Sequence, residues 1–366
     1  MPLTAGIVGL PNVGKSTLFN AITRSQVEAA NYPFATIQPN VGVVEVKDER
    51  LKEIARIFTS KKTIYTTFEF RDIAGLVKGA SQGEGLGNQF LSHIRDVDAI
   101  VHVVRCFDDH TITHVEESVD PVRDIEIINL ELILSDQQSI ENRISKVERK
   151  AKQKDKDAMI EFALLQKIND QLNAGKSVRN LDLNKDEELL IKSFNLLTQK
   201  PVIYVANMAE NEVLNAEKNN YYQLVSKIAQ DEDAVILPIC AKIEEELAGL
   251  DDEERDLFLN DLGYHESGLD QIIKSTYSLL SLWSYFTAGP QEARAWTFIK
   301  GMKAPECAGI IHTDFQKGFI KAECYAYDDL IQHQSEQAVK DMGKFRIEGK
   351  EYLVKDGDIL HFRFNV

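Results

Sequence analysis

The sequence predicts an α/β protein in which a sheet covered by helices on both faces carries a helical insertion and is followed by a small mixed α+β module. Three observations carry this prediction. Short apolar runs alternate with helical segments over the first hundred residues. A long helical pattern without Gly or Pro then interrupts the alternation. After residue 283, turns rich in Gly and Pro separate short strand-like runs.

The alternating part has strand-like runs on both sides of the insertion. A glycine-rich turn follows the first run, and a helix is expected at residues 17–23. The strand-like runs lie at residues 3–8, 41–46, 66–70, 99–104, 201–206 and 234–239. The acidic segment 244–261 is expected to form helical surface. We therefore expect four parts: residues 1–125, 126–200, 201–282 and 283–366.

The insertion is expected to be an antiparallel helical hairpin with coiled-coil-like spacing. Its apolar residues recur at intervals of three, four or seven along two successive helices, the second of which stops near Gly175. These residues are Ile133, Ile140, Ile144, Val147 and Ala151, followed by Met159, Phe162, Leu165, Ile168 and Leu172. The alternative is a pair of ordinary packed helices.

Length and composition place the chain among folded proteins of two or three domains. It has 366 residues, of which 27% are charged and 43% hydrophobic. No run approaches the roughly 18–20 apolar residues that span a membrane, and the first residues resemble a strand rather than a signal peptide. The four cysteines form no Cys-x-x-Cys pair, which argues against a zinc site or a disulfide framework. Cytosol is the expected compartment.

The net charge of −16 is unevenly distributed. Residues 131–200 carry 13 basic and 12 acidic groups, and residues 283–366 carry 11 and 12, so the acidic excess lies in the remaining chain. Seven basic residues gather in the insertion: Arg143, Lys146, Arg149, Lys150, Lys152, Lys154 and Lys156. Such a run is either a solvated helix face or a contact for RNA or another acidic surface.

A phosphate-binding pattern opens the chain. Residues 9–16 read Gly-Leu-Pro-Asn-Val-Gly-Lys-Ser, which matches the P-loop pattern, and they lie between a predicted strand and a predicted helix. The glycines let main-chain N–H groups face the phosphates, and the helix N-terminus adds its positive end. We expect Lys15 to reach the β- and γ-phosphates and Ser16 to bind Mg²⁺. The nucleotide-binding set is Asn12, Val13, Gly14, Lys15, Ser16 and Thr17.

Two further elements suit a nucleoside triphosphate. Asp72 follows a strand-like run and opens Asp-Ile-Ala-Gly, so its carboxylate is expected to support Mg²⁺ and the Gly75 N–H to sense the γ-phosphate. Thr36, in the segment Asn-Tyr-Pro-Phe-Ala-Thr, offers a hydroxyl that would complete the Mg²⁺ shell. Alone, Thr36 would be an ordinary loop residue.

These segments together resemble the YchF family of Obg-like ATPases over essentially the whole chain. The resemblance rests on residues 9–16, 34–36 and 72–87 and on the C-terminal module. It also rests on residues 207–210, which differ from the base-binding pattern of GTPases. It implies a P-loop NTPase G domain with an inserted helical domain, followed by a TGS domain of β-grasp type. It also implies a preference for ATP, association with ribosomes and a link to stress responses.

The base-binding segment departs from the GTPase pattern. Where GTP-binding relatives have Asn-Lys-x-Asp, this chain has Asn207-Met208-Ala209-Glu210. The lysine is missing and the carboxylate is longer and displaced, so discrimination for guanine is weakened. Asn207 can still bond adenine, and Met208 can pack against it. Cys240-Ala241-Lys242 resembles the Ser-Ala-Lys that closes this pocket in the superfamily. ATP is therefore the expected nucleotide, with GTP weaker.

Hydrolysis is expected to be slow, because Leu76 stands where many GTPases have a glutamine that orients water. His114 is a candidate that would swing toward the γ-phosphate, although a lone loop histidine is usually only surface. His93 is interpreted as structural. Asn12 suggests a K⁺ site, as in relatives with Asn at this position.

The sequence thus predicts a cytosolic Mg²⁺-dependent ATPase switch, with Lys15, Gly75 and His114 as catalytic candidates. Ser16, Thr36 and Asp72 are the metal ligands, and Asn207, Met208 and Glu210 contact the base. Ribosome and ribosomal RNA are the expected partners, and neither membrane nor DNA is expected. Two alternatives stay open: a GTPase of the same fold, and a ribosome- or RNA-binding adaptor with incidental turnover.

Overall fold

The computed structural model describes residues 3–24, 40–74 and 86–365. Contacts divide the chain into two units, each formed from segments distant in sequence. The first unit comprises Met1–Val44 and Glu69–Ile272, and the second comprises Glu45–Phe68 and Ile273–Val366. From the sequence, residues 45–68 are expected to belong to the first part of the chain, whereas the structure groups them with the C-terminal module.

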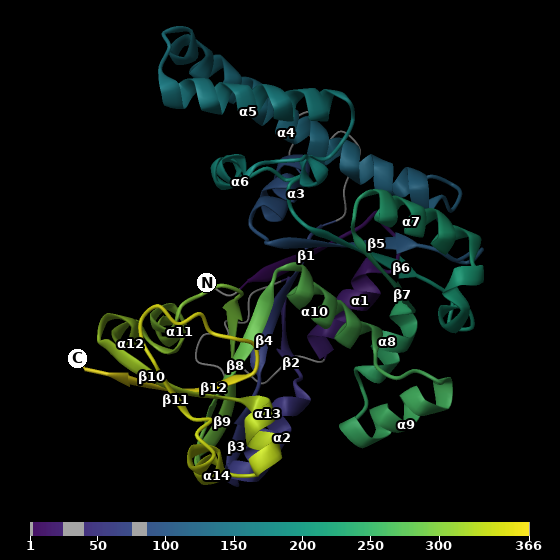
Figure 1. Ribbon diagram of the computed structural model, residues 1–366. Helices are drawn as coiled ribbons and strands as arrows, with labels where there is room; N and C mark the ends of the chain where they lie inside the picture. The colour runs from purple at the N-terminus through teal and green to yellow at the C-terminus, as the bar shows by residue number, and fades with distance from the viewer. Residues whose placement is uncertain (1–2, 25–39, 75–85, 366) are drawn as a thin grey trace. The chain divides into compact units, whose positions relative to one another are not determined.

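The first unit is built on a six-stranded sheet in the order β2-β4-β1-β5-β6-β7 (Figure 1). Strands β4, β1, β5, β6 and β7 pair in parallel. All residues of β1, β5 and β6 are buried, as expected for strands of a sheet covered on both faces. The strands are β1 (Thr4–Val8), β2 (Val41–Val46), β4 (Thr66–Asp72), β5 (Ala99–Arg105), β6 (Val202–Asn207) and β7 (Val235–Ile239).

Helices pack on both sides of this sheet. Helices α1 and α8 pack together, as do α4 and α7, and Figure 1 shows the two pairs on opposite sides of β5, β6 and β7. The helices outside the insertion are α1 (Lys15–Arg24), α3 (Leu86–Arg95), η5 (Val213–Lys218), α7 (Asn220–Asp231), α8 (Ala241–Leu247), α9 (Asp252–Leu262) and α10 (Gly268–Leu279). The alternation of strands and helices predicted from sequence is confirmed.

The insertion is a helical hairpin formed by α4 (Pro121–Lys152) and α5 (Lys156–Asn173). The side-chain pairs Gln137 with Asn173 and Arg143 with Glu161 show that the helices run antiparallel. Its core buries Ile133, Ile140, Leu165, Ile168 and Leu172, as their spacing predicts, with Ile144 and Val147 partly buried against them. Met159, which the same spacing places in the core, is 51% exposed. The shorter elements η3 (Val178–Asn180), α6 (Lys185–Ile191) and η4 (Lys192–Phe194) follow.

The base of the hairpin is held by a buried carboxylate. Asp136 is fully buried and accepts hydrogen bonds from the N–H groups of Leu197 (2.9 Å) and Thr198 (2.8 Å) and from the Thr198 hydroxyl (2.7 Å). Burial raises the pKa of Asp136 although these donors act in the opposite direction. The chain leaving the hairpin is therefore fixed to α4 just before it enters β6.

The second unit is a six-stranded mixed sheet in the order β11-β10-β12-β8-β9-β3. Its strands are β3 (Lys62–Ile64), β8 (Leu282–Ala288), β9 (Glu292–Ile299), β10 (Phe319–Ala326), β11 (Arg346–Glu348) and β12 (Asp358–Phe364). Its helices are α2 (Glu49–Phe58), α11 (Ala304–Ile311), α12 (Thr313–Lys317), α13 (Tyr327–His333) and α14 (Glu336–Asp341).

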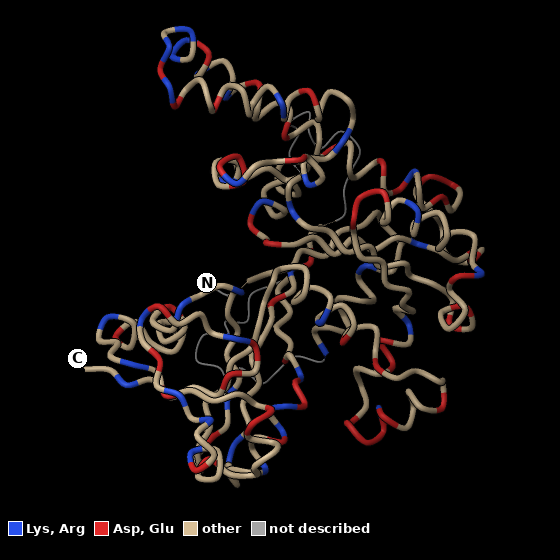
Figure 2. The backbone as a smooth tube through the Cα atoms, viewed as in Figure 1, with Lys and Arg blue, Asp and Glu red and all other residues tan. Residues whose placement is uncertain are grey.

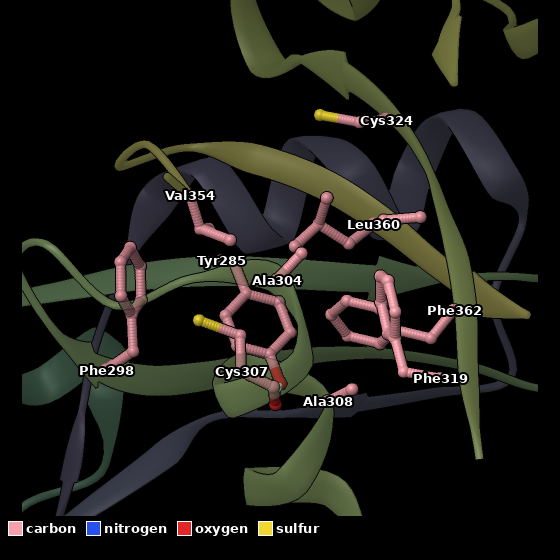
Figure 3. Close-up of a cluster of buried hydrophobic side chains, with 11 residues drawn as sticks. Tyr285, Phe298, Ala304, Cys307, Ala308, Phe319, Cys324, Val354, Leu360 and Phe362 are labelled. Atoms are coloured by element: carbon pink, nitrogen blue, oxygen red, sulfur yellow. Dashed lines mark hydrogen bonds between the residues drawn. The ribbon is translucent and has the colours of Figure 1, made fainter. Parts of the chain in front are cut away.

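Two apolar clusters form the core of this unit. In one, α11 packs on the sheet, and Figure 3 shows Tyr285 among Phe298, Phe319 and Phe362. The Tyr285 hydroxyl donates to the Cys307 carbonyl (2.8 Å). The other cluster joins Leu51, Ile54 and Ala55 of α2 to residues of β8, β9, β10, β12, α13 and α14.

Polar contacts fix residues 45–68 within the second unit. Arg50 donates to Asp356 (2.7 Å), whose other oxygen accepts the Ser284 N–H (2.8 Å). Strand β3 pairs in parallel with β9, and the Ser60 hydroxyl donates to the Gly289 carbonyl (2.8 Å). A helix and a strand from the N-terminal part of the chain therefore complete the C-terminal module (Figure 1).

Candidate nucleotide-binding site

The phosphate-binding loop connects β1 to α1, as the sequence predicts. Lys15 is the first residue of α1, and the Leu18 N–H donates to the Gly14 carbonyl (3.0 Å), which closes the first helical turn. The first turn of α1 contains no acidic side chain, so the positive end of the helix is not neutralised from within. Ser16 is exposed and Thr17 is partly buried at the same helix end.

Gly14 has a backbone conformation and a setting that a larger residue cannot share. Its φ is +95°, in the region that L side chains rarely adopt. A Cβ atom at this position would lie 2.1 Å from Nδ2 of Asn207. The glycine is therefore required both for the turn of the loop and for the close approach of β6.

Lys15 and Asp72 form an ion pair in this site. Asp72 ends β4, where Ile7 of β1 is its register partner, so the carboxylate lies at the carboxyl edge of the sheet beside the loop. The Lys15 side chain is 10% exposed and that of Asp72 is 22% exposed, which leaves the pair accessible from one side. The sequence-predicted phosphate ligand and metal ligand are thus brought together.

Asn207 joins the phosphate-binding loop to the base-binding side of the sheet. It is the last residue of β6 and is 5% exposed. Its Nδ2 donates to the Val13 carbonyl (2.9 Å), and its Oδ1 accepts the Ala241 N–H (3.0 Å). The amide oxygen and one of the two N–H bonds are therefore used within the protein, and among the described residues the second N–H is left for a base.

The rest of the base segment is divided between core and surface. Met208 is 1% exposed and its N–H donates to the Ile239 carbonyl (2.8 Å), whereas Glu210 is exposed. Cys240 is buried and Lys242 is exposed. Burial raises the pKa of the Cys240 thiol, which keeps it protonated near neutral pH.

The loop after β5 lies against the phosphate-binding loop. The Nδ2 of Asn12 donates to the Thr113 carbonyl (3.0 Å), and Asn12 has a φ of 64°. Arg105, the last residue of β5, is 1% exposed and lies within this region. Arg105 is not among the residues predicted from the sequence; the available signal was a basic residue at the end of a strand that is apolar apart from His102.

His114 is buried in the same loop rather than exposed. Its Nδ1 accepts the Glu116 N–H (3.1 Å), so Nε2 carries the proton and donates to Asp124 of α4 (2.9 Å). Asp124 also accepts from Arg123 (3.0 Å). Both ring nitrogens are therefore occupied, and the ring would have to leave both partners to reach a phosphate. The catalytic role of His114 stays a prediction.

Thr36, Gly75 and Leu76 lie outside the described residues, so their expected roles stay predictions. Among the residues that the structure describes, no three His, Cys, Asp or Glu side chains cluster as a metal site. Within the same residues, no helix is long and apolar enough to cross a membrane. All four cysteines are free and buried.

The basic run of the sequence lies at the far end of the hairpin, where Figure 2 shows blue segments gathered at the turn between α4 and α5. We call residues 143–160 the hairpin tip. Six of the seven basic side chains are exposed, and Met159 and Ile160 beside them are 51% and 58% exposed. Lys152 is paired with Glu148 (2.7 Å) and Arg143 with Glu161 (2.5 Å), and the tip keeps an excess of positive charge.

Known families match the chain near both of its ends. Residues 4–136 match the family described as "50S ribosome-binding GTPase". Residues 282–365 match the YchF-GTPase C-terminal family, described as "Protein of unknown function (DUF933)".

Full-length relatives agree with these matches. The chain is 58% identical to the "Ribosome-binding ATPase YchF" of Bacillus subtilis and 54% identical to that of Mycoplasma genitalium, in each case over 100% of both chains. The solved structure of the Schizosaccharomyces pombe YchF GTPase superposes with a TM-score of 0.90 at 42% identity, covering 99% of this chain and 97% of that one. The likeness thus extends over the whole length of the chain, and the chain belongs to the YchF family.

Proposed function

We propose that this protein is a slow Mg²⁺-dependent nucleotide hydrolase that prefers ATP to GTP and acts as a switch on the ribosome. The observation that carries the proposal is the convergence of Lys15, Asp72 and Asn207 around one loop, in a chain whose curated relatives are named ribosome-binding ATPases. This arrangement supplies a cation for the phosphates, a carboxylate for the metal, and a base-binding residue, Asn207, that is fixed by hydrogen bonds to the phosphate-binding loop and α8.

Ser16 and Asp72 would hold Mg²⁺ together with the nucleotide phosphates, and Thr36 would complete the shell. The donors fit, because Mg²⁺ prefers oxygen ligands and is usually bound through one or two carboxylates plus phosphates. Mg²⁺ supplies charge neutralisation on the transferring phosphoryl group. Lys15 binds the β- and γ-phosphates, and the Gly75 N–H contacts the γ-phosphate.

Preference for ATP follows from the base segment. Glu210 is exposed, and Asn207 has a single N–H free for a base. A guanine would lose the carboxylate that reads it in other relatives, whereas adenine requires only a donor and an apolar contact. The names of the relatives differ on this point, because the bacterial proteins are named ATPases and the yeast structure is that of a GTPase. The alternative function is therefore that of a GTPase with the same fold.

Slow turnover follows from the water-positioning groups. Leu76 carries no group that can orient water, and His114 is held by Asp124 and the Glu116 N–H. Asn12 uses Nδ2 on the Thr113 carbonyl, so its Oδ1 is the group that would face a K⁺ ion. A potassium-stimulated rate would support this ligand.

Equilibrium binding and turnover of ATP and GTP, each with Mg²⁺ and with either K⁺ or Na⁺, test the proposal. Tighter ATP binding with slow hydrolysis is expected. Lys15→Ala should abolish binding or hydrolysis, and Lys227→Ala, which changes an exposed lysine of α7, should behave as the parent protein. Near-normal turnover of Lys15→Ala would refute the site, and a clear GTP preference would establish the GTPase alternative.

Ribosome association is proposed to use the hairpin tip, whose exposed lysines suit ribosomal RNA. Association of this kind would place the protein in the cytoplasm, where the family resemblance also implies a stress-related role. Each lost phosphate contact lowers the salt dependence of binding by roughly 0.7 to 0.9 in log–log slope. Reversal of Lys150, Lys152 and Lys154 to Glu should therefore weaken ribosome binding and flatten its salt dependence.

The matched control reverses three exposed lysines away from the tip: Lys176, Lys185 and Lys192. Equal loss in both variants would exclude a specific role for the tip. A hydrolysis-dead protein that kept its cellular role, together with a tip variant that lost it, would favour an RNA- or ribosome-binding adaptor over an ATPase switch.

A further inference from the structure

The loop that follows β5 is organised around a buried arginine. The Arg105 side chain donates from Nε to the Phe107 carbonyl (3.1 Å), from one terminal nitrogen to the Ile112 carbonyl (3.1 Å) and from the other to the Asp109 carbonyl (3.0 Å). Its Cζ lies 4.8 Å from the centre of the Phe107 ring. One guanidinium thus fixes the loop backbone at three carbonyl groups.

This loop contacts the nucleotide site at both of its ends. At its start, the Cys106 N–H donates to the Asn207 carbonyl (2.8 Å), next to the base segment. Near its end, the Thr113 carbonyl accepts Nδ2 of Asn12 in the phosphate-binding loop (3.0 Å). The position of the Thr113 carbonyl depends on the preceding residues, of which Ile112 is held by Arg105.

Arginine suits this role because its donors form a rigid planar fork, and lysine does not. A guanidinium presents five N–H groups in fixed directions, whereas an ammonium is a point donor on a flexible stem. Arg105 is 1% exposed, so its three hydrogen bonds are shielded from water on the arginine side, whereas the loop residues that accept them are partly buried or exposed. A lysine at this position would leave carbonyls of the loop unpaired.

We propose that Arg105 is a positioning residue for nucleotide binding, which acts by shaping residues 106–114 so that Thr113 holds Asn12 of the phosphate-binding loop. The inference rests on the proposed function, since it assumes that this loop binds nucleotide. It adds a residue outside the known sequence pattern, linked to the phosphate-binding loop through the hydrogen bond between Thr113 and Asn12.

A double-mutant cycle tests this link. The dissociation constant of Mg²⁺-ATP is measured for the parent, Arg105→Lys, Asn12→Ala and the double variant. If Arg105 acts through Asn12, the effect of Arg105→Lys on affinity is smaller in the Asn12→Ala background by at least about threefold. If the two effects multiply, Arg105 is only structural and the inference fails. Arg294→Lys, which changes an arginine stacked at 4.2 Å on Trp296, is the control and should leave affinity unchanged.

A second variant covers the case in which Arg105→Lys does not fold. Phe107→Leu removes the ring under the guanidinium and leaves the three carbonyl bonds in place, so a smaller loss of affinity is expected, and this loss should again be reduced in the Asn12→Ala background. The outcomes separate the two proposals. If the parent protein does not bind Mg²⁺-ATP, the proposed function fails; if the parent binds and neither loop variant is coupled to Asn12, this inference fails alone.

Discussion

Replacing Asn207 by alanine removes the side chain that joins the phosphate-binding loop to β6 and α8. The change deletes two hydrogen bonds, from Nδ2 to the Val13 carbonyl (2.9 Å) and from the Ala241 N–H to Oδ1 (3.0 Å). Val13 and Ala241 are 1% and 3% exposed, so their main-chain groups lose partners in a poorly hydrated place. Nucleotide affinity should fall as well, because the loop loses its brace.

The magnitude follows from these two bonds. A buried main-chain group left without a partner costs about 1–3 kcal/mol, so the pair predicts a destabilisation of about 2–6 kcal/mol. For a unit of this size, 1 kcal/mol shifts the melting temperature by roughly 2–4 °C. The unfolding transition of the nucleotide-binding unit should therefore move down by about 4–24 °C.

Scanning calorimetry without nucleotide measures this shift, and equilibrium binding of Mg²⁺-ATP measures the functional effect. Asn142→Ala, at an exposed position of α4, is the matched control and should change stability by less than about 0.5 kcal/mol. A melting temperature of Asn207→Ala within about 1 °C of the parent, together with unchanged affinity, would refute the reasoning.

Two more predictions concern buried groups away from the phosphates. Asp136→Ala leaves the Leu197 and Thr198 donors unpaired at the base of the hairpin, so urea unfolding should show a free energy of unfolding lower by about 3–5 kcal/mol. The control Asp157→Ala, at an exposed position, should leave the free energy of unfolding unchanged. A loss under about 1 kcal/mol in Asp136→Ala would contradict this role. Burial, together with the nearby Arg179, lowers the pKa of His102 from 6.5 to about 3. His102 is therefore neutral in the folded protein, and its contribution to stability is fully present above pH 6.5. As the pH falls below 6.5, the free energy of unfolding decreases by about 1.4 kcal/mol per pH unit, because the unfolded chain takes up the proton. Between pH 6.5 and 5, His102→Phe should lose about 2 kcal/mol less stability than the parent or the exposed-site control His265→Gln, and equal slopes would count against this account.

Several features of the fold follow from short-range patterns. The strand at Thr4–Val8, the glycine turn and the helix at Lys15–Arg24 are encoded within about 20 residues of each other. The hairpin is likewise predicted, because helical spacing of apolar residues specifies which face of each helix is buried. In both cases the residues that interact are close in the sequence or repeat at a fixed interval.

The placement of residues 45–68 is not accessible from such patterns. Helix α2 and strand β3 have ordinary local signals, and nothing in them indicates which sheet they join. The choice is made by the pairing of β3 with β9 and by the packing of Leu51 and Ile54 in the second unit. These contacts connect segments more than two hundred residues apart.

The residues of the nucleotide site divide in the same way, into those found by local sequence patterns and those brought together by the fold. The phosphate-binding loop with Lys15 and Ser16, and the position of Asp72 after a strand, can be predicted from the sequence because each is a local pattern tied to one strand end. The contacts made in the folded chain cannot: Asn207 bonds to Val13, 194 residues away, His114 is held by Asp124, and Arg105 shapes the loop beside Asn12. A buried polar group takes whatever donor or acceptor the fold brings to it, and the folded backbone, rather than the residue type, determines which one that is.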